Sequence, residues 1–209
     1  MQTTLNAKDL TLNEVHRLLK LERDREPVSF SDFMTLEPLT DAQSQEIAQI
    51  VDDFEYYLRA GKVLEGQIQF LVLAPLLRLA GFYRAPIYLS LEQGIAEICI
   101  EDEDTSIRGR MDILAAKTSR NTKLWMLVVE TKNSEADALN GLPQLLTYAH
   151  SSLEQQESVW GLTTNGISFR FVHLQAGNPA TYRILPEVNL VDRDRALQLL
   201  QVLNALCKL

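Results

Sequence analysis

The sequence predicts an α/β protein in which a mixed central sheet is flanked by helices. Two strand-like segments, residues 110–116 and 124–131, lie near the middle of the chain, and segments with helical spacing of apolar residues lie on both sides of them. The second segment contains the apolar run LWMLVV, which is typical of a strand covered on both faces. We therefore expect these two strands to be central to the fold.

Composition places the chain among soluble globular proteins. Its 209 residues, 46% hydrophobic and 23% charged, fit one domain with a sizeable core. No apolar stretch is long enough to span a membrane, and residues 1–15 lack the basic and apolar regions of a signal peptide. Two cysteines, Cys99 and Cys207, lie far apart in apolar contexts, which favours buried thiols over a disulfide or a metal pair. We expect a cytoplasmic protein.

Net charge argues against a domain that wraps nucleic acid by itself. The chain carries a formal charge of −8 with a pI of about 4.9, whereas such domains are usually basic. A site that binds metal ions would supply positive charge of its own.

The first 61 residues are predicted to form a helical extension, and residues 62–209 the main domain. An amphipathic helix is expected over residues 11–25. A second is expected from Thr40, which forms a capping-box pattern with Gln43, to a stop at Gly61. No chemistry is visible in this part of the chain, so helices that serve packing or dimerisation are expected.

The main domain is predicted to begin with a strongly apolar helix over residues 62–80. Pro75 is expected to kink this helix, and Gly81 to end it. Strands are predicted at residues 86–91, 96–100, 107–116, 124–132, 158–163 and 167–173, with an edge strand at 182–185, an acidic loop at 101–104 and a polar turn at 118–122. Helices are predicted from residue 141, with Pro143 in the first turn, and over residues 195–206 after a cap at Asp192.

Acidic residues stand at fixed places in the two central strands. Asp112 interrupts the first apolar run, and Glu130 closes the second. Alternation puts Glu130 and Lys132 on one face of the strand, with Thr131 pointing away. If the strands are antiparallel neighbours, the two carboxylates can reach one divalent cation. Such oxygen ligands, with the carbonyl of Thr131 as a further one, suit Mg²⁺ or Mn²⁺.

A metal ion at this position would point to phosphodiester chemistry. It could polarise a phosphodiester, stabilise the leaving oxygen and orient a water molecule. Lys132, beside the carboxylates, could position that water or stabilise charge that develops on phosphorus. The alternatives are a plain ion pair between Lys132 and Glu130, and an ordinary strand-end carboxylate at Asp112.

The pattern resembles the PD-(D/E)XK nuclease superfamily. The matching residues are Asp112 in GRMDILA and the Glu-Thr-Lys of VVETK, with Met111 in place of the usual proline before the aspartate. Gln144 and Tyr148 match the Gln-xxx-Tyr motif of the RecB-like branch, and Glu65 matches an acidic residue on the first core helix of many members. The hairpin WGLTTNGISFRFV is similar to a segment of the N-terminal nuclease domain of type I restriction enzyme R subunits. The resemblance covers residues 62–172, roughly half the chain.

This resemblance implies a restriction-endonuclease-like fold and a Mg²⁺- or Mn²⁺-dependent endonuclease that hydrolyses DNA. The residues that it assigns to the site are Asp112, Glu130 and Thr131 for metal, Lys132 and Glu65 for catalysis, and Gln144, Tyr148 and Arg110 for orienting the site or the nucleic acid. For Gln144 and Tyr148 the alternative is a helix edge packed on the sheet, and for Glu65 a solvated edge residue.

The sequence also bears on the partners of the protein and on alternative functions. No Gly-rich phosphate loop of the GxxxxGK[ST] kind occurs, so the chain is not expected to be a complete translocating restriction subunit. DNA is the expected partner, and a helicase or specificity subunit and a second copy of the chain are further candidates. The basic residues nearest the site could contact phosphates; they are Arg108, Arg110, Lys117, Arg120 and Lys123. One alternative function is a catalytically silent nuclease-fold module that binds a partner or nucleic acid. Another is a hydrolase that uses His16, His150 or His173, although these have no ligand spacing.

Overall fold

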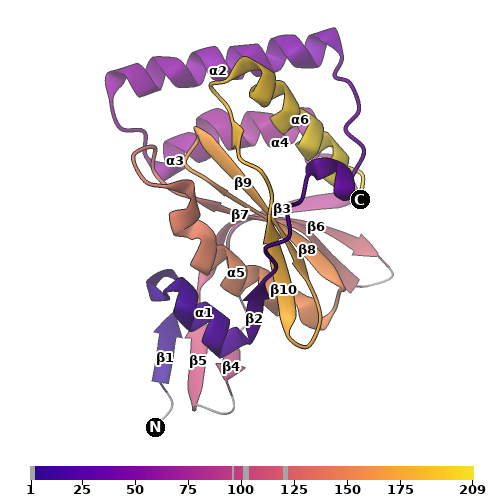
Figure 1. Ribbon diagram of the computed structural model, residues 1–209. Coiled ribbons are helices and arrows are strands. Elements are labelled where there is room, and N and C mark those ends of the chain that lie inside the picture. Colours follow the sequence, from indigo (N-terminus) through magenta and orange to yellow (C-terminus); the bar gives the residue numbers. More distant parts are fainter. Residues whose placement is uncertain (1–2, 96, 101–103, 120–121) are drawn as a thin grey trace.

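An eight-stranded mixed sheet runs through the protein (Figure 1). The computed structural model describes residues 3–95, 97–100, 104–119 and 122–209. The strand order is β2 (Leu21–Arg23), β10 (Ala180–Ile184), β9 (Ser168–Gln175), β8 (Ser158–Thr164), β7 (Thr122–Thr131), β6 (Arg110–Ser119) and β3 (Ile87–Gly94), with β11 (Val188–Asn189) paired to β9. β7 pairs with β8, and β10 with β2, in parallel; the other neighbours are antiparallel. The predicted α/β class and mixed sheet are confirmed.

A second, three-stranded sheet has the order β1 (Thr3–Asn6), β5 (Thr105–Arg108) and β4 (Ile98–Ile100). The prediction of a single strand over residues 107–116 is wrong, because the chain passes from β5 in the small sheet to β6 in the large one at Gly109. The predicted strand at 96–100 begins, in the described residues, at Ile98. Part of the acidic loop (101–103) and of the polar turn (120–121) lies outside the described residues.

Strands as well as helices occur in the first 61 residues. The predicted helix at 11–25 ends early, as α1 (Leu12–Leu19), because Lys20 adopts a left-handed conformation with φ 49° and ψ 46°. The chain then continues as β2, which pairs in parallel with β10. β10 therefore lies inside the sheet, and the prediction of an edge strand there is wrong. β1 belongs to the small sheet and β2 to the large sheet. The prediction that this segment is purely helical is therefore wrong.

The long helix α2 (Asp41–Ala60) begins where the capping box predicted. The Thr40 amide donates to Gln43 Oε1 at 3.1 Å, and the Gln43 amide donates to Thr40 Oγ1 at 3.2 Å. Ile47, Ile50 and Phe54 form the buried face of α2. This face packs against the helices that cover one side of the large sheet.

The predicted apolar helix at residues 62–80 is divided into three parts. These are α3 (Glu65–Ile68), a π-helical turn η3 (Gln69–Leu73) and α4 (Ala74–Ala80). Pro75 lies in the first turn of α4. It lacks an N–H, and its ring crowds the preceding turn, so a wider π turn before it relieves the clash. Gly81, in a left-handed conformation with φ 98°, ends α4 as predicted.

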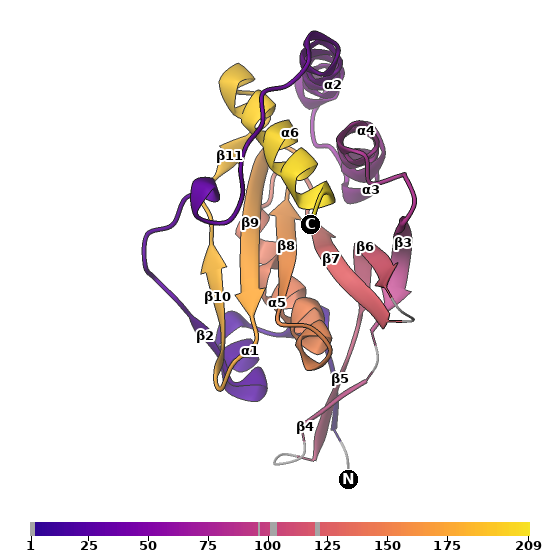
Figure 2. The same cartoon turned by 90° about the vertical axis from the view of Figure 1, so that its right-hand side faces the viewer.

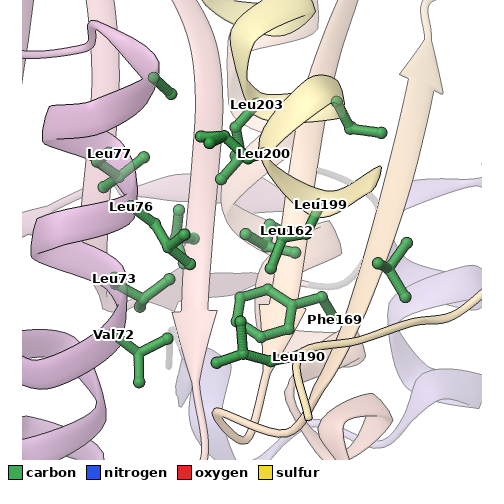
Figure 3. Close-up of a cluster of buried hydrophobic side chains, with 14 of the residues drawn as sticks. Val72, Leu73, Leu76, Leu77, Leu162, Phe169, Leu190, Leu199, Leu200 and Leu203 are labelled. Atoms are coloured by element: carbon green, nitrogen blue, oxygen red, sulfur yellow. The ribbon is translucent and has the colours of Figure 1, made fainter. Parts of the chain in front are cut away.

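Helices cover both faces of the large sheet (Figures 1 and 2). α2, α4 and α6 (Arg193–Cys207, capped by Asp192) pack on one face, and α1 and α5 (Leu142–His150) on the other. Figure 3 shows leucines of α4 and α6 against Leu162 of β8 and Phe169 of β9. Successive side chains of the central strands point to opposite faces of the sheet, so each strand contributes to both cores. Val129 faces the first core and Val128 the second.

Short helical turns complete the description: η1 (Ala7–Asp9), η2 (Phe30–Asp32), η5 (Ala138–Gly141) and η6 (Ser151–Glu154). None of the helices that the structure describes is long and apolar enough to cross a membrane.

Candidate active site

The two predicted carboxylates lie opposite each other on neighbouring strands. β6 and β7 are antiparallel, and Ile113 pairs with Val129, so Asp112 and Glu130 occupy the next position of the ladder. The Thr131 amide donates to Asp112 Oδ2 at 2.7 Å. The expected antiparallel arrangement is therefore confirmed, and a hydrogen bond ties the first acid to the end of the second strand.

Glu130 and Lys132 form a nearly buried ion pair. Lys132 Nζ donates to Glu130 Oε1 at 2.8 Å, and the two side chains are only 18% and 2% exposed. The expectation that alternation places them on one face of β7 is borne out by this contact. The Lys132 amide donates to the Thr164 carbonyl of β8 at 2.7 Å, which holds the chain beyond β7 against the sheet.

Gln144 and Tyr148 extend this pair into a chain of hydrogen bonds. Lys132 Nζ donates to Gln144 Oε1 at 3.1 Å, and Gln144 Nε2 donates to the Tyr148 hydroxyl at 3.0 Å. The Arg110 amide donates to the same hydroxyl at 3.3 Å. One turn of α5 thus connects Lys132 with the start of β6. The hydrogen bond confirms the prediction that these two side chains share a helix face, and their joint role stays a prediction.

Burial controls the protonation of the acids. Burial, with the neighbouring Asp112 carboxylate, raises the pKa of Glu130 to about 8, although Lys132 acts in the opposite direction. Burial also raises the pKa of Asp112, against the effect of the Thr131 amide. Burial raises the pKa of Tyr148 to about 12, so its hydroxyl keeps its proton at neutral pH.

One oxygen of the site has no partner. Glu130 Oε2 is buried and accepts no hydrogen bond within the part of the chain that the structure describes. A buried acceptor without a partner costs about 1–3 kcal/mol. A bound cation would remove this cost.

Two glycines that the sequence did not single out let the elements approach. A Cβ on Gly109 would lie 2.6 Å from Tyr148 Cε1, and a Cβ on Gly141 would lie 2.9 Å from Glu130 Cγ. Neither position can hold a larger residue unless the side chain beside it moves. No pattern in the sequence indicated them, because the close approaches exist only once α5 packs on the sheet.

Gln69 and Glu65 approach the site from the first core helix. Gln69, at the start of the π turn, has Nε2 3.5 Å from Thr131 Oγ1, and sequence reasoning missed it. The Glu65 carboxylate contributes to the raised pKa of Glu130. Within the described residues, no three His, Cys, Asp or Glu side chains lie close enough to bind one metal ion. The site therefore presents two carboxylates, and a role for Glu65 stays a prediction.

The basic residues near the site are already engaged. Arg110 forms an ion pair with Glu92 at 2.7 Å, so its side chain turns toward β3 while its amide serves Tyr148. The others are Arg108, paired with Glu97; Lys123, bonded to Gln93; and Lys117, bonded to the Leu209 carbonyl. Arg120 lies outside the described residues. The exposed ion pairs of Arg108 and Arg110 are weak, so either arginine can leave its glutamate and bind a phosphate instead.

Two of the three histidines contact aromatic side chains. The ring of His16 is 3.0 Å from the Tyr182 hydroxyl, and that of His173 packs against Trp160. Burial lowers the pKa of His150, and that of His173 to about 4. The contacts of His16 and His173 are those of packed side chains, and the alternative of a histidine-dependent hydrolase stays a prediction.

Neither a scan of the sequence against protein-family models nor a search of the curated proteins gives a match.

Proposed function

We propose that the protein is a divalent-metal-dependent nuclease of restriction-endonuclease-like fold that hydrolyses DNA phosphodiester bonds. The observation that carries the proposal is the unpaired, buried Glu130 Oε2, beside a second carboxylate and a lysine that is already held in place. A purely structural ion pair would have no need of a second, half-buried acid next to it.

The donor set fits Mg²⁺ or Mn²⁺. Asp112, Glu130 and the Thr131 carbonyl offer only oxygen, which these hard cations prefer. When bound, the ion would supply Lewis-acid polarisation of the phosphate and a more acidic water. Burial of the two carboxylates in a low-dielectric setting strengthens their attraction for a cation.

Lys132 would act on the substrate directly. An ammonium group has three N–H donors, and two of them are used by Glu130 and Gln144. The third can donate to a phosphate oxygen or to the attacking water, and the positive charge stabilises the negative charge that develops on phosphorus. Gln144 and Tyr148 are positioning residues, since they reach the reacting atoms only through Lys132.

The test is cleavage of single-stranded, duplex and supercoiled DNA with Mg²⁺ or Mn²⁺. We expect wild type to cut and Lys132→Ala to lose activity by a factor on the order of 10²–10³. Lys62→Ala is the matched control, because Lys62 pairs with Glu135 at 3.4 Å on the surface. Equal cleavage by wild type and Lys132→Ala would show that the mechanism is wrong.

A second candidate is a nuclease-fold module that binds a partner or nucleic acid without cutting. The net charge of −8 and the ion pairs that engage the arginines favour it. Thermal stabilisation by Mn²⁺ separates the two candidates, because a silent module has no reason to bind metal. Stabilisation without cleavage would indicate that a partner, such as a helicase or specificity subunit, delivers the DNA.

A further inference from the structure

A row of polar side chains continues from Glu130 across the large sheet, on the face that α5 covers. Glu130 of β7 pairs with Thr163 of β8, and Thr163 pairs with Arg170 of β9. Figure 2 shows these three strands side by side. Val129 and Leu162, which precede the first two residues, belong to the core on the opposite face, so alternation places the row on the α5 side. We call Glu130, Thr163 and Arg170 the polar row.

Each member of the polar row has one buried atom without a hydrogen-bond partner in the part of the chain that the structure describes. These atoms are Glu130 Oε2, Thr163 Oγ1 and Arg170 Nε. The other end of the arginine is engaged, because Arg170 Nη1 donates to Glu187 Oε2 at 3.1 Å. Buried polar atoms are normally satisfied by protein or by ordered water. Three unsatisfied atoms on adjacent strands therefore indicate a shared partner.

The donors and acceptors of the polar row are arranged in one direction. Arg170 Nε can only donate, the Thr163 hydroxyl can donate and accept, and Glu130 can only accept once it is ionised, as metal binding requires. Neighbouring strands lie about 4.8 Å apart, which is too far for a direct hydrogen bond. It is close to the span of one water molecule with a bond of about 2.8 Å on either side. One water between each pair of side chains would satisfy all three atoms.

Gly141 shows independently that Thr163 lies beside the candidate active site. An added Cβ at Gly141 would lie 2.9 Å from Glu130 Cγ and 3.4 Å from Thr163 Cγ2. The same point is 3.4 Å from Lys132 Cε. One glycine of η5 therefore touches the acid, the lysine and the threonine together, and Thr163 belongs to the surroundings of the two groups that the proposed chemistry uses.

We propose that Thr163 and Arg170 are positioning residues of the candidate active site and act on Glu130 through two buried water molecules. Arg170 Nε donates to the first water, which donates to Thr163 Oγ1. The Thr163 hydroxyl donates to the second water, which donates to Glu130 Oε2. This role rests on the proposed metal binding by Glu130. An ionised carboxylate offers about four lone-pair sites, so Oε2 can accept this bond and still face a cation. Hydrogen bonds behind a metal ligand fix its orientation, and a bridging water serves nearly as well as a direct contact.

Thermal unfolding of metal-free Thr163→Val tests the water molecules. Valine keeps the shape of threonine but lacks the hydroxyl, so it removes two water-bridged bonds and should lower Tm by about 2–6 °C. If the polar row were dry, the same change would remove an unsatisfied buried hydroxyl and would raise Tm instead. The sign of the shift therefore separates the two cases. A high-resolution crystal structure should show one ordered water on either side of Thr163.

The dissociation constant for Mn²⁺, measured without DNA, tests the positioning role. Removing a hydrogen-bonding group behind a metal ligand weakens binding by about 10- to 100-fold. We expect this loss for Thr163→Val and a value near that of wild type for Thr163→Ser, which keeps the hydroxyl. Arg170→Lys keeps the charge but not Nε, and should weaken binding by up to about tenfold.

Two control variants should bind Mn²⁺ as wild type does. Glu187→Gln removes only the exposed partner of Arg170 Nη1. Thr147→Val makes the same substitution at an equally buried threonine of α5, whose hydroxyl donates to the Pro143 carbonyl at 2.8 Å.

A raised Tm for metal-free Thr163→Val would overturn the inference, whatever the metal does. So would Mn²⁺ binding by Thr163→Val that equals wild type, or equal weakening by Thr163→Ser or Thr147→Val. Wild-type protein that binds no Mn²⁺ would remove the proposed nuclease and, with it, the positioning role. In that case a lowered Tm for Thr163→Val would still show that the polar row holds water, so the two failures are distinguishable.

Discussion

Metal binding should depend steeply on pH, because protons compete with the cation for Glu130. Burial raises the pKa of this carboxyl to about 8. A divalent cation binds the deprotonated form, so the apparent affinity is highest above pH 8 and falls about tenfold for each pH unit below it. Because half of the Glu130 carboxyl is still protonated at pH 8, the dissociation constant for Mn²⁺ should rise by about 50-fold between pH 8 and pH 6. The raised pKa of Asp112 acts in the same direction.

The assay is thermal unfolding with and without Mn²⁺ at each pH. At a concentration of about 100 times the dissociation constant measured at pH 8, binding stabilises the protein by about 2.7 kcal/mol, which raises Tm by about 5–11 °C. The same concentration at pH 6 is only about twice the weakened dissociation constant, and the shift should shrink to about 1–3 °C. Shifts of equal size at the two pH values would refute the reasoning.

The stability of the metal-free protein should depend on pH in the opposite sense and should fall as pH rises. A carboxyl whose pKa is higher in the folded state stabilises the fold fully below its unfolded pKa of about 4.5 and loses that stability as pH rises toward about 8. Between pH 6 and pH 8 the loss is about 2 kcal/mol. Glu130→Gln carries no proton to titrate, so it should lack this part of the pH dependence and the response to Mn²⁺. A Glu130→Gln protein that is still stabilised by Mn²⁺ would place the metal elsewhere.

Three substitutions test how packing positions the site. Gly109→Ala would press on the Tyr148 ring, with a Cβ 2.6 Å from Cε1, and should lower the free energy of unfolding by about 1–3 kcal/mol in urea titration; an unchanged midpoint would contradict the close approach. Gly141→Ala would displace Glu130, 2.9 Å from the new Cβ, and should slow DNA cleavage on the order of 10²-fold, whereas wild-type rates would show that the acid tolerates the shift. Phe54→Ala empties a fully buried position on α2 and should cost about 3–5 kcal/mol of stability, measured by calorimetry; a loss below about 1 kcal/mol would mean that α2 packs loosely.

The sequence by itself determined most of the local structure and the chemistry of the site. The Thr40 capping box, the stop at Gly81 and the cap at Asp192 are local hydrogen-bonding patterns, and each helix end occurs where its pattern predicts. Alternation along one strand sufficed to place Glu130 beside Lys132. The four-residue spacing of the Gln-xxx-Tyr motif likewise sufficed to make its two side chains neighbours.

Only the tertiary structure decided how distant segments combine. The pairing of β2 with β10 and the split at Gly109 between two sheets depend on contacts between residues far apart in the chain. Periodicity reports which face of a segment is apolar, but it does not report which segment covers that face. The raised pKa of Glu130 arises in the same way, since burial is a property of the assembled fold. For this protein, the sequence named the candidate site residues, and packing decided their protonation and the side chains that support them.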